Sequence, residues 1–291
     1  MKEIKPGTYE GERALYMLKD AVVKDSTFQN GESPLKESAN IEIYGSLIKW
    51  KYPLWYCNNV LLKDSMIFEM GRAGIWYTNN LKVEDTVIKA PKNFRRCKDV
   101  SLKNVPLPNA QETFWNCDGI RMENVTAKGD YFAMGSKNIY ADNFVLDGNY
   151  SFDGCENIEI HNSKLLTKDA FWNCENVTVY DSFISADYIG WNSKNVTFIN
   201  CTIETLQGMC YLENLVMRNC KVLNTDHAFE FSTVDVELST PIESVFNPIS
   251  GTIKAPEIGN LIMEKEMIDP SKTKIECGNI LKKSDHPDWT N

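Results

Sequence analysis

The sequence has little that would anchor a chain in a membrane or attract it to nucleic acid. Its 291 residues contain no run of 18 apolar residues and the mean hydropathy is −0.35, so no transmembrane helix is expected. The first twenty residues lack the apolar segment of a secretory signal, which favours a cytoplasmic location and no membrane partner. Its 31 basic residues are outnumbered by 40 acidic ones, and a net charge of −9 argues against a nucleic-acid partner.

Motifs for cofactors and metals are also missing. Neither GxGxxG nor GxxxxGK[ST] occurs, so neither of the common nucleotide-binding loops is expected. The nine cysteines are an odd number and include no CxxC pair, which argues against a disulfide framework and against a zinc site. We therefore expect no cofactor and no metal, and a reducing compartment.

What the sequence does contain is a repeat of about 19 residues. Its most regular part is a small residue, any residue, Asn (sometimes Asp or Gly) and an aliphatic residue. Ten copies start at Ser38, Cys57, Thr78, Cys97, Cys117, Ser136, Cys155, Cys174, Ser193 and Leu212. Weaker copies near Leu18 and Ser232 extend the repeat over roughly residues 12–240.

The length and pattern of the repeat predict its fold. Each copy holds short apolar–polar alternations broken by Asn, Asp or Gly, which is a strand-and-turn pattern. A copy is too short for a helical repeat, which takes about 34 residues. Three short parallel strands per coil, each about 4.8 Å from its equivalent in the next coil, account for it. We predict an all-β, single-stranded, right-handed parallel β-helix of about 10–12 coils, because parallel crossovers prefer this hand.

Columns of equivalent residues, counted from the small residue as position zero, separate structural positions from others. Positions +2 and +7 are nearly all Asn or Asp, which tolerate left-handed corners and can bond from coil to coil, so we interpret them as structural. Position zero is often Cys, which packs as a small buried hydrophobe. Position −3 is a core column; it holds Leu54, Ile75, Phe94, Phe114, Phe152 and Phe171 among others.

The repeat fades after Pro241, and the chain changes character. Aliphatic residues continue through 263 but are interrupted by Pro248 and Pro256. We predict one domain in which residues 1–240 form the β-helix and residues 241–291 form an irregular segment that caps its open end. The polar stretch from Lys282 to Asn291 is expected to be loosely held.

Position −2 is the column that breaks the structural pattern. Five of the seven tryptophans fall in it, together with Arg95, Asp153 and Glu230. Because position −3 points inward, this column is expected to point outward, beside a floor of small residues at position −4. Charged residues at −6 and −5, including Asp169 and His227, would form one border, and Arg96 the other. The candidate ligand-binding residues are Trp55, Trp76, Trp115, Trp172, Trp191, Arg96 and His227.

Flat indole rings suit the apolar faces of sugars, and the flanking charges suit hydroxyl groups, so the expected ligand is a carbohydrate or another polyhydroxylated molecule. The catalytic candidates are Asp153, Arg95, Glu230 and Asp169. Asp153 could serve as a general acid, but Glu230 is four coils away, about 19 Å, and too far to be its partner in glycoside hydrolysis. A polysaccharide lyase would use Arg95 as base. Whether the protein is an enzyme stays open.

The tryptophan column has a second interpretation. The C-terminal segment, a second copy of the chain or a protein partner could cover it, which would make the protein a non-catalytic assembly or structural protein and a possible homo-oligomer. A concave groove with converging charged groups would favour an enzyme, and a flat or covered strip would favour an interface.

Several stretches carry a resemblance to a known family: KWKYPLWYC (49–57), AGIWYT (73–78), NFRRC (93–97), NAQETFWNC (109–117), GDYFAMGS (129–136), GNYSFDG (148–154) and KDAFWNCENVTVYDS (168–182). Through them the chain resembles a bacterial family of single-stranded right-handed β-helix proteins known only as a domain of unknown function, in the pectin-lyase-like superfamily. The resemblance implies this fold and a bacterial cytoplasmic setting, but no reaction. The polygalacturonase pattern of Asn-Thr-Asp, Asp-Asp, Gly-His-Gly and Arg-Ile-Lys is absent, so none of its catalytic residues is carried over.

Overall fold

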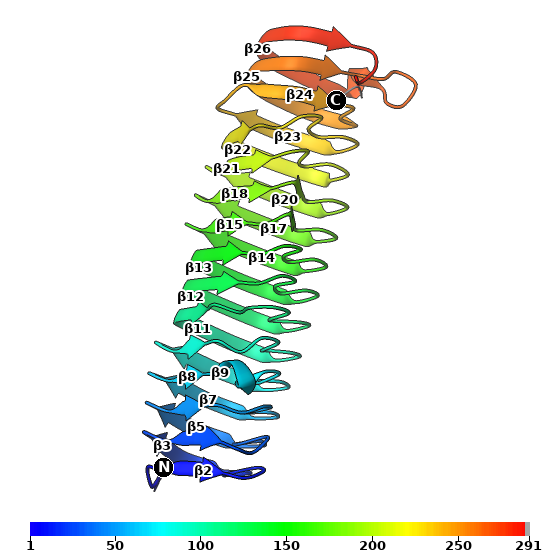
Figure 1. Cartoon of the computed structure of the whole chain (residues 1–291). Coiled ribbons are helices and arrows are strands. Elements are labelled where there is room, and N and C mark those ends of the chain that lie inside the picture. The colour runs from blue at the N-terminus through cyan, green and yellow to red at the C-terminus, as the bar shows by residue number, and fades with distance from the viewer. Residues whose placement is uncertain (289–291) are drawn as a thin grey trace. The chain divides into compact units, whose positions relative to one another are not determined.

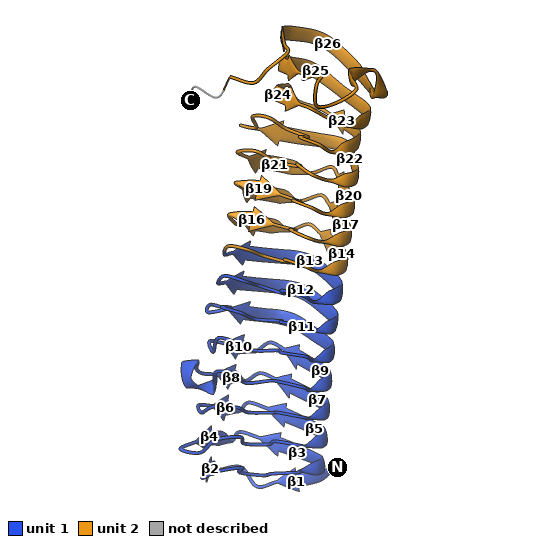
Figure 2. Ribbon diagram, turned by 90° about the vertical axis from the view of Figure 1, so that its right-hand side faces the viewer, with its two compact units in different colours: residues 1–148 blue, residues 149–291 orange. Residues whose placement is uncertain are grey.

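The structure, a computed structural model, describes residues 1–288 and confirms an all-β fold built from parallel coils (Figure 1). The chain divides into two compact units, residues 1–148 and 149–291, and each is a stack of parallel coils (Figure 2). Among the described residues, no helix has the length and apolar character needed to cross a membrane.

In unit 1 the first five coils have a principal strand on one side and a shorter strand on the other, whereas each of the last three has one long principal strand (Figure 2). The principal strands are β1 (Lys2–Ile4), β3 (Lys19–Lys24), β5 (Ala39–Tyr44), β7 (Asn58–Lys63), β9 (Asn79–Glu84), β11 (Lys98–Leu107), β12 (Asp118–Lys128) and β13 (Lys137–Asp147). The shorter strands are β2 (Thr8–Glu10), β4 (Thr27–Gln29), β6 (Leu47–Ile48), β8 (Met66–Ile67) and β10 (Val87–Ile88), with the 3₁₀ turn η1 at Glu69–Gly71.

Unit 2 repeats this arrangement. Its principal strands are β14 (Glu156–His161), β17 (Glu175–Tyr180), β20 (Lys194–Ile199), β22 (Glu213–Leu223), β23 (Thr233–Leu238), β25 (Ser250–Ile262) and β26 (Thr273–Ser284). The others are β15 (Lys164–Leu166), β16 (Asp169–Ala170), β18 (Phe183–Ala186), β19 (Tyr188–Ile189), β21 (Thr202–Thr205) and β24 (Ile242–Phe246), with the 3₁₀ turn η2 at Pro270–Lys272.

The register places each residue beside its equivalent in the next coil. Val60 of β7 pairs with Leu81 of β9, and Leu81 pairs with Val100 of β11. The side chains at this position are buried, as are those two residues further along each strand. The alternation seen in the sequence therefore points one face of every principal strand into the core.

The third stretch of each coil is not a regular strand, contrary to the sequence prediction. Residues at positions −5, −3 and −1 have positive φ angles, for example Tyr52 at 60°, Leu54 at 56° and Tyr56 at 58°. Such angles do not belong to an extended strand. Coil-to-coil bonds still form, because the Tyr56 amide donates to the Trp76 carbonyl and the Leu54 amide donates to the Pro34 carbonyl. Only isolated bridges and the short pair β16–β19 result.

The coils extend beyond both ends of the recognisable repeat. The principal strand occurs eight times in the described part of unit 1 and seven times in that of unit 2, about fifteen turns in place of the predicted 10–12. The segment predicted to be irregular, residues 241–291, contains regular strands between 242 and 284, because β23 pairs with β25 and β25 with β26 in parallel register. Their coils lack the Asn-containing pattern and were missed for that reason. The last three residues of the predicted loose tail lie outside the described part.

The predicted core and asparagine ladders are confirmed. The Phe94 and Phe114 rings stack in unit 1 with centroids 4.5 Å apart, and Phe152 and Phe171 stack in unit 2 at 5.3 Å. In the +2 column the Asn176 amide nitrogen donates to the Asn157 side-chain oxygen at 3.0 Å. The Asn195 amide nitrogen in turn donates to the Asn176 oxygen at 2.9 Å. Each of these side-chain amides thus links its coil to a neighbouring coil. The backbone of the same asparagines adopts the positive φ angle that the corner requires.

Replacing Asn176 tests how much one ladder position contributes. Asn176→Ala removes two hydrogen bonds and leaves a Cβ-bearing residue without polar compensation at φ 60°, so the free energy of unfolding should fall by about 1–3 kcal/mol. Asn176→Gly loses the same bonds but tolerates this φ and should recover roughly 1 kcal/mol of that loss. Urea denaturation of the three proteins measures both changes. Equal stability of all three would contradict a structural role for the ladder.

Candidate functional site

The tryptophan column of unit 1 is a continuous stack of side chains. The Trp55 and Trp76 rings lie 4.9 Å apart and are nearly parallel, at 8°. The Arg95 guanidinium follows, with its Cζ 4.9 Å from the Trp76 ring centre and 4.4 Å from that of Trp115. Both faces of Trp76 are therefore covered, one by an indole and one by a guanidinium, and a sugar ring cannot stack on it.

The indole nitrogens of this stack are also engaged. Trp55 Nε1 donates to the Ala73 carbonyl at 2.7 Å, and Trp76 Nε1 donates to the Lys92 carbonyl at 2.8 Å. Trp115, beyond Arg95 in the column, repeats the pattern by donating to the Tyr131 carbonyl at 2.7 Å. These three tryptophans are half-buried and hold successive coils together.

The floor of small residues expected beside this column is not on the surface. Side chains at position −4 are buried with those at −3; they include Pro53, Gly74, Thr113, Ser151 and Ala170. The parity argument assumed an extended strand, whereas the alternating positive φ angles turn two adjacent positions inward. The groove predicted on this face is therefore absent in the described residues.

Arg95 is held in an ion pair. Its Nη2 donates to Glu112 Oε2, Lys92 Nζ lies 3.1 Å from Glu112 Oε1, and only 22% of the Arg95 side chain is exposed. The Glu112 carboxylate thus occupies the guanidinium, which is therefore poorly placed to act as the base of an elimination. Arg96 is exposed and lies over the Tyr77 ring, with Cζ 5.9 Å from its centre.

The stack in unit 2 is less regular and begins at Trp172. The Trp172 and Trp191 centroids are 6.0 Å apart at 33°, and Trp191 lies 4.5 Å from the Tyr211 ring. One coil earlier, the same column holds Asp153 where a ring would continue the stack. Trp172 therefore has an aromatic neighbour on one side and a carboxylate position on the other.

Three of the candidate residues meet here around one small cavity, which we call the Asp169 cavity. It has a volume of about 20 Å³ and is lined by Tyr150, Ser151, Asp153, Asp169 and Trp172. Two buried polar atoms at this site, Asp169 Oδ1 and Trp172 Nε1, have no hydrogen-bond partner among the described residues. Trp172 thus differs from Trp55, Trp76 and Trp115 of unit 1, whose nitrogens bond to carbonyls of the next coil.

The two carboxyl groups of the Asp169 cavity have different surroundings. Asp169 is only 4% exposed, and burial raises the pKa of its carboxyl, with nearby Asp187 adding to the increase and Lys168 opposing it. Asp153 is half-buried, and its Oδ1 accepts a hydrogen bond from Asn173 Nδ2 at 2.8 Å. Asp153 therefore lies nearer the surface and Asp169 deeper.

The remaining candidates, Glu230 and His227, do not line this cavity. Gln207 Nε2 and the Tyr211 hydroxyl donate to the two Glu230 oxygens at 2.9 and 3.3 Å, while burial raises the pKa of its carboxyl. His227 Nδ1 lies 2.8 Å from Asp226 Oδ2.

A serine lies beside this histidine–aspartate pair. The Ser244 hydroxyl donates to Asp226 Oδ1, on the carboxylate that faces His227 Nδ1. A catalytic triad would instead bond the serine to the histidine, so the cluster is not arranged to activate a nucleophile.

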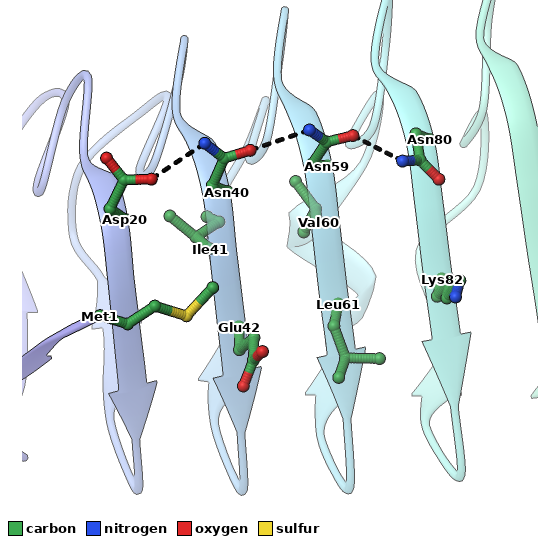
Figure 3. A pocket seen from close by; sticks show the side chains of 10 residues that line it. All are labelled: Met1, Asp20, Asn40, Ile41, Glu42, Asn59, Val60, Leu61, Asn80 and Lys82. Carbon is green, nitrogen blue, oxygen red and sulfur yellow. Dashed lines mark hydrogen bonds between the residues drawn. The ribbon is translucent and has the colours of Figure 1, made fainter.

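A feature that the sequence analysis missed is a shallow groove over the principal strands of unit 1. One part, about 510 Å³, runs across β3, β5, β7 and β9 between the +2 asparagines and the outward side chains Glu42, Leu61 and Lys82 (Figure 3). A second part of about 370 Å³ adjoins it at Asn80 and Lys82. The asparagine side chains of the first part bond one another, so they offer little unused hydrogen-bonding capacity.

No thiol or metal chemistry is indicated in the described residues. Eight of the nine cysteines are buried and all are free. Burial raises the pKa of the Cys57, Cys174 and Cys210 thiols to about 12, so each stays protonated at neutral pH. Among residues 1–288, no group of three His, Cys, Asp or Glu side chains could hold a metal ion.

The fold and surface define the chain as a parallel β-helix protein with stacked aromatic side chains. More specifically, it belongs to the family described as "Protein of unknown function (DUF3737)", whose model matches residues 2–276. A search of curated proteins found no match.

Two kinds of solved structure resemble it. The surface adhesin PfbA of Streptococcus pneumoniae is 9% identical, with 91% of this chain and 68% of that one covered and a TM-score of 0.31. The plasmid-mediated fluoroquinolone resistance protein QnrB1 is 10% identical, with 80% of this chain and 93% of that one covered and a TM-score of 0.26.

The buried thiols predict a simple chemical titration. In the native protein a disulfide reagent such as DTNB should react quickly with one thiol, Cys277, which is the half-buried one, and with the others only after unfolding. Cys277→Ser should abolish the fast phase. Rapid reaction of several thiols in the folded protein would contradict the buried column.

The Asp169 carboxyl predicts a pH dependence of stability. Because its pKa is raised, the folded protein binds this proton more tightly than the unfolded chain, and stability falls as pH rises through the range between the two pKa values. Asp169→Asn has no carboxyl to ionise at this position and so does not lose stability in this way. The difference in free energy of unfolding between the variant and wild type should therefore shift in favour of the variant as the pH rises from about 4. Urea denaturation at several pH values measures it. Ser151→Ala, at the same cavity, is the control, and its free energy of unfolding should depend on pH in the same way as that of wild type. The inference would be wrong if Asp169→Asn also showed the pH dependence of wild type.

Proposed function

We propose that the protein binds a carbohydrate on the outer face of unit 2, at the rim of the Asp169 cavity. The observation that carries this proposal is the position of Trp172 at the start of its stack. Its ring meets Trp191 on one side, while the preceding position of the column is Asp153. An indole face next to a carboxylate and a tyrosine suits a sugar, whose ring has apolar faces and hydroxyl edges.

The other predicted binding residues have supporting roles in this proposal. Trp191 packs behind Trp172, whereas Trp55, Trp76 and Trp115 hold the coils of unit 1 together. Asp153, half-buried at the rim, can accept a hydrogen bond from a hydroxyl group. We also infer that the β-helix belongs to the pectin-lyase-like superfamily, which the parallel coils and the sequence resemblance support.

Binding is better supported than cleavage. Glycoside hydrolysis needs two carboxyl groups on either side of the scissile bond, with room between them for the sugar. Asp153 and Asp169 line the same cavity, but about 20 Å³ does not admit a sugar ring, and Asp169 is 4% exposed. Arg95, the base of the alternative elimination, is paired with Glu112.

Self-association is a second candidate function, and a different surface supports it. In unit 1 the Tyr56 and Tyr77 rings stack at 4.7 Å beside the tryptophans, and Tyr56 is 50% exposed. Exposed aromatic rings of this kind often mark contacts between proteins. Sedimentation velocity on wild type and Tyr56→Ser would detect an oligomer that depends on this surface.

The carbohydrate proposal predicts a loss of binding confined to one tryptophan. In a screen of soluble oligosaccharides, including uronates, a ligand should change the intrinsic fluorescence in a saturable way. Trp172→Ala should weaken its binding about thirtyfold or more, as truncation of an anchoring ring does. Trp76→Ala is the matched control, because both faces of that ring are covered, and it should bind as wild type does.

Calorimetry gives the dissociation constants, and circular dichroism checks the fold of each variant. Absence of any saturable response across the panel, or equal weakening in the two variants, would contradict the proposed site.

A further inference from the structure

Two of the residues that line the Asp169 cavity each have a buried polar atom without a partner, and the two atoms differ in hydrogen-bonding character. Trp172 Nε1 carries a hydrogen and can only donate, whereas an ionised Asp169 Oδ1 can only accept. Leaving both unsatisfied in the interior would be unfavourable, because a buried polar group without a partner loses its hydration and gains nothing in return. Both residues line the cavity, and an occupant that accepts from Trp172 Nε1 and donates to Asp169 Oδ1 would satisfy both atoms.

The size of the cavity limits the occupant to one non-hydrogen atom or little more. A cavity of about 20 Å³ is large enough for a single water, which needs about 10–15 Å³ by this measure. A metal cation is disfavoured because the indole N–H would direct its hydrogen toward it, and an anion is disfavoured by the Asp169 carboxylate. An alkyl group would leave both polar atoms unsatisfied. A hydroxyl oxygen meets every requirement.

We propose that the Asp169 cavity is a binding site for one hydroxyl group, which accepts a hydrogen bond from Trp172 Nε1 and donates one to Asp169 Oδ1. Water fills it in the free protein. In the complex, a hydroxyl group of the ligand replaces that water; this second step rests on the proposed carbohydrate binding.

The depth of the lining residues indicates which hydroxyl the site takes. Ser151 and Asp169 are buried, whereas Tyr150, Asp153 and Trp172 are half-buried and form the rim. A sugar ring resting on the rim can reach the buried carboxyl only with a group that projects from the ring. The primary hydroxyl on the exocyclic carbon of a hexose is such a group. The site should therefore select hexoses with a 6-hydroxyl over their 6-deoxy analogues.

The first test concerns the free protein and does not depend on any sugar. With ¹⁵N-labelled tryptophan, the indole N–H signal of Trp172 is identified by its loss in Trp172→Phe. Nuclear Overhauser contacts between that hydrogen and water should show a bound water with a residence time longer than that of surface water. The corresponding hydrogens of Trp55 and Trp76 bond to carbonyls and serve as internal controls. A Trp172 N–H without a long-lived water would overturn the site.

The second test uses matched sugars as probes: D-galactose with D-fucose, and D-glucose with 6-deoxy-D-glucose. Shifts of the Trp172 indole signal should give a dissociation constant about tenfold or more lower for the 6-hydroxyl sugar of at least one pair. Binding by the variants is followed on the Trp191 indole signal. The preference should disappear in Trp172→Phe, which keeps a ring but has no N–H, and in Asp169→Ala, which has no acceptor. Asp169→Asn keeps an acceptor oxygen and should retain part of the preference for the 6-hydroxyl sugar.

Trp76→Phe, whose ring is covered on both faces and does not line the cavity, should behave as wild type. The outcomes separate the two proposals. If sugars bind through Trp172 but 6-deoxy analogues bind equally well, carbohydrate binding stands and selection by the cavity is wrong. If the long-lived water is present but no sugar binds, the hydroxyl site holds for water and its role in ligand binding is wrong.

Discussion

The structure depends on one constraint, the placement of every side chain directly beside its equivalent in the neighbouring coils. Parallel pairing enforces it, as in the pairing of Val60 with Leu81 and of Leu81 with Val100, although the register shifts between β22 and β23. Each column must therefore consist of residues that tolerate their own kind at short distance. Amides meet this condition by donating to one another, and aromatic rings by stacking. Like charges do not, which explains why Arg95 lies between two indoles and bonds to Glu112.

The same constraint explains why the candidate site lies where a column is interrupted. A perfect column satisfies its own members and leaves nothing for a ligand, as the +2 asparagines and the Trp55–Trp76 stack illustrate. At Trp172 the preceding position of the column is occupied by Asp153 instead of an aromatic residue, and the indole nitrogen has no carbonyl partner. Side chains can therefore contact a ligand at positions where they do not bond to, or stack on, their equivalents in the neighbouring coils. A coil contacts only its neighbours, so such an interruption destabilises the fold locally.

Much of the fold could be predicted from the sequence, because the period, the asparagine columns and the inward aliphatics each follow from this stacking. The wrong predictions, a third strand in each coil and a floor of small residues on the surface, have a common cause. The apolar–polar alternation indicates extended strands but carries no information on backbone φ angles. Positive φ at alternate positions turned the −4 column inward and removed the third strand, and neither effect is visible in residue types alone. Asp153, Asp169 and Trp172 were all named as candidates. Their meeting at one cavity, with unsatisfied Nε1 and Oδ1 atoms, required side-chain positions.

The contrast between the two tryptophan environments indicates how such a fold can acquire a binding site. In unit 1 the indole nitrogen of each stacked tryptophan donates to a carbonyl of the next coil, so ring and backbone stabilise each other. Trp172 keeps the ring contact with Trp191 but not the carbonyl contact. The interior there holds a carboxyl whose pKa is raised by burial, a cost to stability that no described partner of Oδ1 offsets. Residues that destabilise the fold locally, where the stacked tryptophans of unit 1 show a stabilising alternative, are what the proposed binding site requires.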